Sequence, residues 1–167
     1  MIAYTYIHNN IRSLNNRYVR SKTTKEADFL SKLAILELCG WLEVSVDDMI
    51  ECAGRRLLKD QSHQKFLKNR VKTTYGFEYD KNFRSLMAFV VGLYGLEIIE
   101  KSIDPVTCIK FKNELAALKI RRDSLAHTYT KGATANYDAP SVTLARLNDV
   151  SAGLKAYDDA IRAFKLR

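Results

Sequence analysis

The chain has 167 residues, of which 47% are hydrophobic and 28% charged, a balance typical of one soluble domain with a single core. No apolar run approaches the roughly 18 residues of a membrane span, and residues 1–10 lack the pattern of a signal peptide. Three scattered cysteines indicate a reduced, cytoplasmic protein. The formal net charge of +8 favours an anionic partner such as nucleic acid, although solvated lysines explain it equally well.

Residues 1–22 mix tyrosines with arginines and predict either a short helix over about 7–19 or an N-terminal arm. Such tyrosines stack on RNA bases or simply pack against the rest of the domain. Thr23-x-x-Glu26 is a capping box, in which the threonine and the glutamate satisfy each other's free backbone N–H groups. It predicts the start of a long helix over about 24–58, where apolar residues recur at helical spacing.

Cationic residues concentrate just after this helix, where a second, shorter helix is predicted over about 61–72. The set consists of Arg55, Arg56, Lys59, Lys65, Lys68, Arg70 and Lys72. Because lysine and arginine neutralise backbone phosphates, these residues are candidates for RNA binding. A solvated helix face is the alternative interpretation.

The next helix follows a predicted turn at Tyr75-Gly76-Phe77, with Asp80 or Asn82 as its cap, and continues to about residue 99. Gly92 and Gly95 lie one turn apart on it. This spacing permits close helix packing, either within the protein or across a dimer.

Asp104-Pro105 is a cap residue followed by proline at the first helical position, and it predicts a helix to about residue 126 or 127. Residues 128–139 are expected to form a loop, and Pro140 then begins a last helix to about 164. With no strand pair, the sequence predicts one all-α domain over 1–167, an up-and-down bundle of about five helices.

Two apolar rows on the helix after Asp104 become polar near its end. One row consists of Cys108, Phe111, Leu115, Leu118, Arg122 and Leu125, so Arg122 stands where the pattern predicts an apolar residue. The neighbouring row reaches Asp123 and His127 after Val106, Ile109, Asn113, Ala116 and Ile120. Because a guanidinium in an apolar row is costly without partners, this interruption indicates a functional site.

The segment from Arg122 to His127 is an R-x4-H motif with a polar residue after the arginine. It resembles the signature of the HEPN superfamily, whose active members are helical, usually dimeric, metal-independent endoribonucleases. The family often has asparagine after the arginine, whereas this chain has Asp123. The resemblance implies a HEPN-like fold and a homodimer in which two motifs form one cleft. It also implies a role in a toxin–antitoxin or anti-phage defence system.

Arg122 and His127 suit RNA cleavage by attack of the ribose 2′-hydroxyl on the adjacent phosphodiester. The guanidinium grips phosphate oxygens, and the imidazole moves protons near neutral pH. Asp123, four residues before His127, is placed to orient the imidazole. Arg121 either contacts phosphate or faces water. Tyr129 corresponds to a tyrosine that, in HEPN toxins paired with a minimal nucleotidyltransferase, receives an inactivating nucleotide; otherwise it stacks or packs.

No metal site or cofactor is expected, because the histidines are isolated and no glycine-rich phosphate loop is present. The expected partners are RNA, a second copy of the chain, and an antitoxin or nucleotidyltransferase, with no membrane. Two other functions stay open. The chain is alternatively a non-catalytic HEPN-like module that binds RNA or protein, or a helical DNA-binding protein, for which charge is the only argument.

Overall fold

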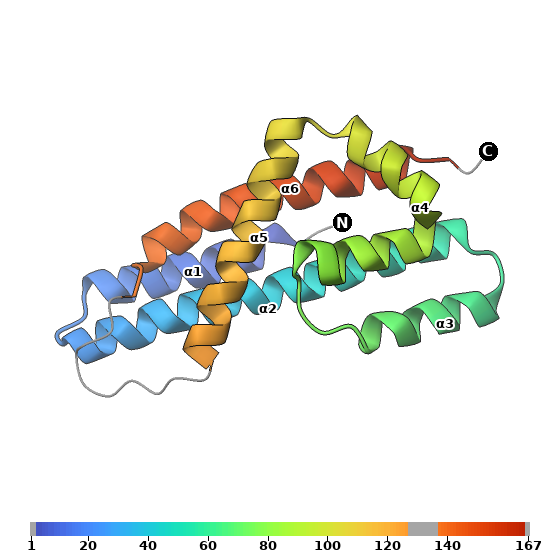
Figure 1. Ribbon diagram of the computed structural model, residues 1–167. Coiled ribbons are helices and arrows are strands. Elements are labelled where there is room, and N and C mark those ends of the chain that lie inside the picture. The colour runs from blue at the N-terminus through green and yellow to red at the C-terminus, as the bar shows by residue number, and fades with distance from the viewer. Residues whose placement is uncertain (1–2, 127–136, 166–167) are drawn as a thin grey trace.

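The computed structural model describes residues 3–126 and 137–165, and in these ranges the protein is all-helical, with no strand (Figure 1). A short π-helical turn, η1 (Tyr79–Phe83), precedes the fourth of the six α-helices. The helices are α1 (Tyr4–Val19), α2 (Thr24–Leu57), α3 (Gln61–Lys72), α4 (Arg84–Ser102), α5 (Pro105–Ala126) and α6 (Pro140–Ala163). The all-α prediction is therefore confirmed, and the count of about five helices is corrected to six.

The helix beyond the five expected is α1, at the N-terminal end, so this segment forms a helix and not an arm. Ile7, Ile11 and Leu14 are buried at helical spacing, which gives α1 an apolar side that packs against α2 and α6. Trp41 of α2 donates from its indole Nε1 to the backbone oxygen of Ala3, 2.7 Å away. The burial of this side and the bond to Ala3, the residue before its first turn, fix α1 to the domain.

Side-chain caps begin three of the six described α-helices: α2, α3 and α5. The Thr23 hydroxyl accepts from the Glu26 N–H at 3.2 Å, and Asp60 accepts from the Ser62 N–H at 2.7 Å. Asp104 accepts from the Thr107 N–H at 2.8 Å, directly before Pro105. Each side chain satisfies a backbone donor that the first helical turn leaves free.

The cap predicted at Asp80 or Asn82 is wrong. Asn82 accepts from the Glu78 N–H at 3.1 Å and donates to the Tyr75 oxygen at 2.9 Å, so it holds the preceding turn. Gly76 in that turn has φ of 94°, a conformation that residues with a Cβ rarely adopt. The buried amide of Asn82 therefore belongs to the turn, and the chain enters α4 through η1 without a side-chain cap.

The two glycines of α4 have different roles. Gly92 adopts φ of 71° and ψ of 167°, which breaks the helix, and a Cβ there would meet nothing within 4 Å. At Gly95 a Cβ would lie 2.8 Å from the Phe164 ring, so this glycine permits close packing within the chain. By length and composition Tyr79–Ser102 is apolar enough to cross a membrane, but half of its most apolar window is buried in the protein and the helix is interrupted at Gly92.

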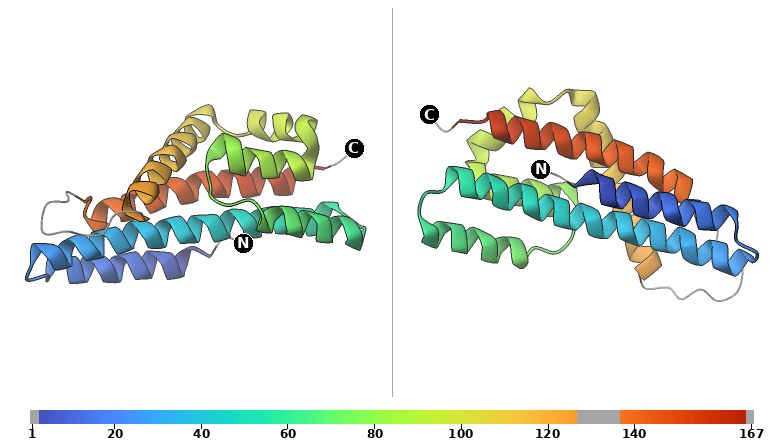
Figure 2. Two further views of the ribbon diagram at one scale, coloured as in Figure 1. Left: turned by 60° about the horizontal axis from the view of Figure 1, so that its bottom comes forward. Right: turned by 180° about the vertical axis from the view of Figure 1, so that it is seen from behind.

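Helices α1, α2 and α6 lie side by side, and α5 crosses them obliquely (Figures 1 and 2). The arrangement thus differs from a simple up-and-down bundle. The rings of Phe83, Phe111 and Tyr157 contact one another where η1, α5 and α6 meet, and all three are fully buried. A Cβ on Gly153 would lie 2.3 Å from the Phe111 ring, so the glycine lets α5 approach α6 closely.

Candidate functional site

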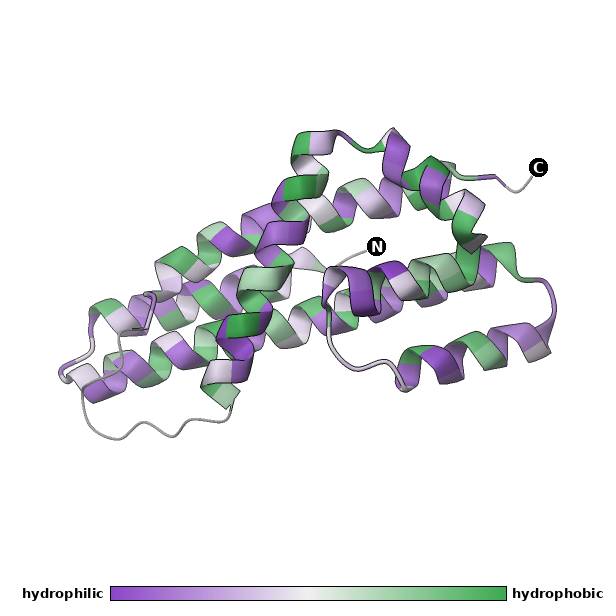
Figure 3. Ribbon diagram, in the orientation of Figure 1, coloured by the Kyte–Doolittle hydropathy of each residue, from purple (hydrophilic) through white to green (hydrophobic). Residues whose placement is uncertain are grey.

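The two rows on α5 face different environments. Phe111, Leu115, Leu118 and Leu125 are buried, as the first row predicts. The second row lies on the exposed side of the chain, since Val106, Ile109 and Ile120 are 71, 61 and 71% exposed. Hydrophobic and hydrophilic segments alternate along α5 in Figure 3. Asp123 therefore continues an exposed row, whereas Arg122 interrupts a buried one.

The Arg122 guanidinium lies between two carboxylates. Its Nη2 is 3.0 Å from Oε1 of Glu43 on α2, and its Nη1 is 3.9 Å from Oδ1 of Asp123. The side chain of Arg122 is 37% exposed, so part of its fork of donors still faces solvent. The buried row is therefore interrupted by a cation that Glu43 of α2 holds in place.

Cys39 lies under this ion pair. Burial raises the pKa of the Cys39 thiol to about 12, partly offset by the positive charge of Arg122 and reinforced by the charges of Glu43 and Asp123. The thiol, which is 1% exposed, lies 3.9 Å from the Leu118 oxygen. A thiol with this pKa stays protonated near neutral pH, so Cys39 packs the floor of the site and is no nucleophile.

Lys119 extends the charged cluster toward η1. Its Nζ lies 2.8 Å from Oδ2 of Asp123 and 3.8 Å from Oε2 of Glu78. The hydrogen bond to Asp123 raises the pKa of Lys119. The carboxylate of Asp123 thus balances Lys119 as well as Arg122. The role predicted for Asp123, orienting His127, stays a prediction, because His127 lies outside the described residues. Tyr129 lies outside them as well.

Arg121 joins α5 to the start of α6. It pairs with Asp138, which also lies 3.8 Å from Arg146 of α6. Arg146 in turn pairs with Glu114 of α5 at 2.8 Å. Arg121 was expected to contact phosphate or face water. In this structure it forms an ion pair that fixes the end of α5 against α6.

Glu43 is the residue of the candidate site that the sequence pattern did not reveal. Glu43, Asp47 and Glu51 follow one another at intervals of four residues along α2, so they form an acidic row. Burial raises the pKa of Asp47 from 3.8 to about 6, and the charges of Glu43, Glu51 and Asp48 add to the shift. The four-residue spacing of these carboxylates is visible in the sequence, but it does not indicate that Glu43 contacts α5.

The seven predicted RNA-binding cations separate into two groups. Arg55 lies 3.5 Å from Glu51 and donates to Cys52, while Arg56 donates to the Ile161 and Arg162 oxygens at the end of α6. Arg56 therefore caps a helix C-terminus. The other five are exposed and form no ion pair with any described residue: Lys59, Lys65, Lys68, Arg70 and Lys72.

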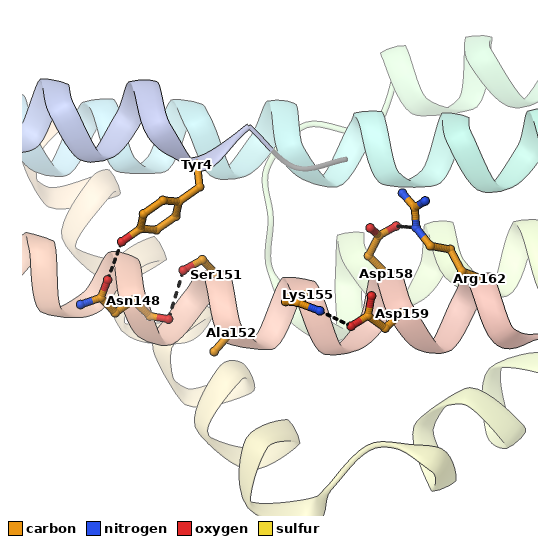
Figure 4. Close-up of a pocket in the computed structure, with 8 residues that line it drawn as sticks. All are labelled: Tyr4, Asn148, Ser151, Ala152, Lys155, Asp158, Asp159 and Arg162. Atoms are coloured by element: carbon orange, nitrogen blue, oxygen red, sulfur yellow. Dashed lines mark hydrogen bonds and ion pairs between the residues drawn. The ribbon is translucent and has the colours of Figure 1, made fainter.

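A large pocket lies away from the motif, between the start of α1 and one side of α6 (Figure 4). It has a volume of about 580 Å³. Its polar side chains are largely satisfied by one another, since Tyr4 donates to Asn148 and Lys155 pairs with Asp159. This pocket therefore does not coincide with the predicted site.

In the described ranges no group of three or more histidine, cysteine, aspartate or glutamate side chains is arranged to hold a metal ion. The three cysteines are unpaired, with Cys39 buried and Cys52 and Cys108 half-buried.

Comparison with known proteins finds no matching family model, no matching curated protein and no matching solved structure.

Proposed function

We propose that the protein is a metal-independent endoribonuclease of the HEPN type, with Arg122 and His127 as its catalytic residues. The observation that supports this most is the position of Arg122. It interrupts a buried apolar row and lies five residues before His127 in the sequence. Its side chain is 37% exposed and pairs with Glu43 of α2. A cation held in place at the surface is suited to a phosphodiester.

In the proposed reaction the His127 imidazole removes the proton from a ribose 2′-hydroxyl. The 2′-oxygen then bonds to the adjacent phosphorus, and the bond from phosphorus to the 5′-oxygen breaks. The 5′-oxygen takes up a proton, which leaves a 2′,3′-cyclic phosphate and a 5′-hydroxyl. Arg122 stabilises the negative charge that develops on the non-bridging oxygens.

The proposed active form is a homodimer with α5 near its twofold axis. The exposed row of Val106, Ile109 and Ile120 supports it, because a second copy of the same row would cover this apolar surface. A twofold arrangement about α5 brings two motifs together, so one His127 accepts a proton while the other donates one.

The proposed setting is cytoplasmic, in a toxin–antitoxin or anti-phage defence system, with RNA as the substrate. An antitoxin or a nucleotidyltransferase would then control the nuclease, and Tyr129 is the proposed acceptor of an inactivating nucleotide.

The second candidate is a non-catalytic HEPN-like module that binds RNA or protein. The ion pair between Arg122 and Glu43 favours it, because a guanidinium already satisfied within the chain also serves as a link between helices. RNA cleavage separates the two candidates.

Removal of metal ions is the first test. Purified protein is incubated with labelled single-stranded RNA in excess EDTA, and the ends of the products are determined. Cleavage is expected to persist and to leave 2′,3′-cyclic phosphate ends, because the proposed step uses only the two side chains. Activity that disappears with EDTA and returns with magnesium, or products with 5′-phosphates, would contradict the mechanism.

A further inference from the structure

The helix α3 carries positive charge that the described part of the protein does not balance. It contains Lys65, Lys68, Arg70 and Lys72 and no acidic residue, and none of these cations pairs with a described carboxylate. Three lysines on other helices differ in this respect, since Lys101, Lys110 and Lys155 each pair with an acidic residue. Unbalanced cations along one helix attract a polyanion.

The same helix also carries an exposed aromatic ring on its flank toward α4. Leu67 and Val71 face the core, which places Lys65, Lys68 and Lys72 together on the outer side of α3. Phe66 lies about 100° round the helix from Lys65, on the flank of α3 that meets α4. It is 63% exposed, and its ring centroid lies 5.6 Å from that of Phe89 on α4, itself 43% exposed. We define these five residues as the α3 surface.

A pocket adjoins the α3 surface, where α3 meets α2. It has a volume of about 280 Å³ and is lined by Arg55, Lys65 and Lys68, together with the amides of Gln61 and Gln64. Glu51 is the one carboxylate in its lining. Arg55 pairs with Glu51, and Gln64 donates to the Leu58 oxygen, so Lys65 and Lys68 are the lining cations without a described ion pair. Such cations suit the oxygens of a phosphate group.

The C-terminal end of α3 is the end nearer, along α2, to the residue that holds Arg122. Leu67 lies against Gly54 of α2, and the two helices run antiparallel (Figures 1 and 2), so Lys72 is roughly level with Met49. Glu43, which holds Arg122, is six residues from Met49, or about 9 Å along the helix.

A second group of cations without described ion pairs lies at the turn between α1 and α2, with Arg20, Lys22 and Lys25. This turn is about 30 Å from Glu43 along α2. The α3 surface is therefore the nearer of the two to the motif.

We infer that the α3 surface binds single-stranded RNA and leads the strand to the site at the end of α5; this inference rests on the proposed nuclease function. Lysines spaced along the helix bind successive phosphates, and the rings of Phe66 and Phe89 stack on unpaired bases. A duplex keeps its bases stacked on each other, so exposed rings favour a single strand.

Binding is tested separately from cleavage with a fluorescent single-stranded oligonucleotide whose 2′-hydroxyls are methylated, so that no reaction takes place. Fluorescence anisotropy compares the triple variant K65Q/K68Q/K72Q with the control K101Q/K110Q/K155Q. Both remove three positive charges, but the control removes them from lysines that are ion-paired. Thermal unfolding verifies that each variant is folded.

The α3 variant is expected to bind at least about tenfold more weakly near 0.1 M salt. The slope of the logarithm of its binding constant against the logarithm of the salt concentration should be shallower by about two to three. The control should change affinity less than about twofold, and Phe66→Ala should weaken binding by about tenfold. Equal losses in the two triple variants would overturn the inference, and so would a loss confined to the variant R20Q/K22Q/K25Q. If the wild type cleaves RNA but the α3 variant binds RNA as well as the wild type does, the binding role of the α3 surface is refuted and the nuclease proposal stands. Binding through α3 without any cleavage would refute the nuclease and leave the RNA-binding surface in place.

Discussion

At the scale of single residues, the central contact is the ion pair between Arg122 and Glu43. Arg122 alone could be picked out in the sequence, because it interrupts an apolar row of α5. Glu43 could not, because its spacing with Asp47 and Glu51 describes only α2. The residues meet through the crossing of α2 and α5, which depends on the whole fold.

Replacing Glu43 tests whether it positions Arg122. Glu43→Gln keeps the size of the side chain but removes the charge that holds Nη2. Cleavage is expected to fall about tenfold in kcat with KM little changed, because a misplaced guanidinium stabilises the transition state less well. Glu37→Gln, one and a half turns earlier on α2, serves as the control. A Glu43→Gln protein that cleaves faster than the wild type would mean that Glu43 competes with phosphate for Arg122.

Asp47 gives the site region a pH-dependent stability. Its folded pKa of about 6 exceeds the unfolded value of 3.8, so the folded state binds the proton more tightly and stability falls as pH rises between these values. Asp47→Asn should therefore increase the free energy of unfolding by about 1 kcal/mol at pH 7.5, discounted for partial exposure, and by little at pH 4.

Urea unfolding at the two pH values measures this difference, with the exposed neighbour Asp48→Asn as the control. A gain of equal size at pH 4 and pH 7.5 would show that burial and the neighbouring carboxylates do not act on Asp47 as described.

At the scale of helices, the sequence predicted elements where the signal is local. Thr23, Asp104 and Pro140 each mark a helix start through their own backbone or side-chain chemistry. The prediction failed at Asn82, whose amide bonds with the turn before it, and at Gly92, whose positive φ breaks α4. The sequence of an apolar helix does not indicate whether a glycine breaks the helix or permits close packing. The backbone angles of the structure are what distinguish Gly92 from Gly95.

The exposed row of α5 leads to a prediction about assembly. The double variant I109D/I120D places two charges on the proposed interface, so it should be monomeric at micromolar concentration where the wild type is dimeric. RNA cleavage should be lost with the dimer. Light scattering measures the mass, and Leu93→Asp provides a control, because Leu93 is 79% exposed on α4.

A wild-type chain that is monomeric at micromolar concentration would contradict this assembly. So would a dimer that survives the α5 substitutions and dissociates when Leu93 is changed.

At the scale of the whole molecule, the periodicity of the sequence predicted the class of fold but not how the helices are arranged. Helical periodicity without a strand pair gave the all-α domain, because it depends on each helix separately. The oblique crossing of α5 depends on contacts such as Phe111 against Gly153, which periodicity does not encode. In the same way, the net charge of +8 indicated an anionic partner, and the described ion pairs then showed which of the cations are left unbalanced.

The measurement that tests the central claim most directly is RNA cleavage by Arg122→Ala, His127→Ala and the double variant, each verified by thermal unfolding. Each single variant is expected to lose about 10²–10⁴-fold in rate, and the double variant little more, because both residues act on one step. Arg122→Lys should recover only part of the loss, since lysine lacks the planar fork. Folded alanine variants that cleave RNA like the wild type would contradict the assignment of Arg122 and His127 as the catalytic pair.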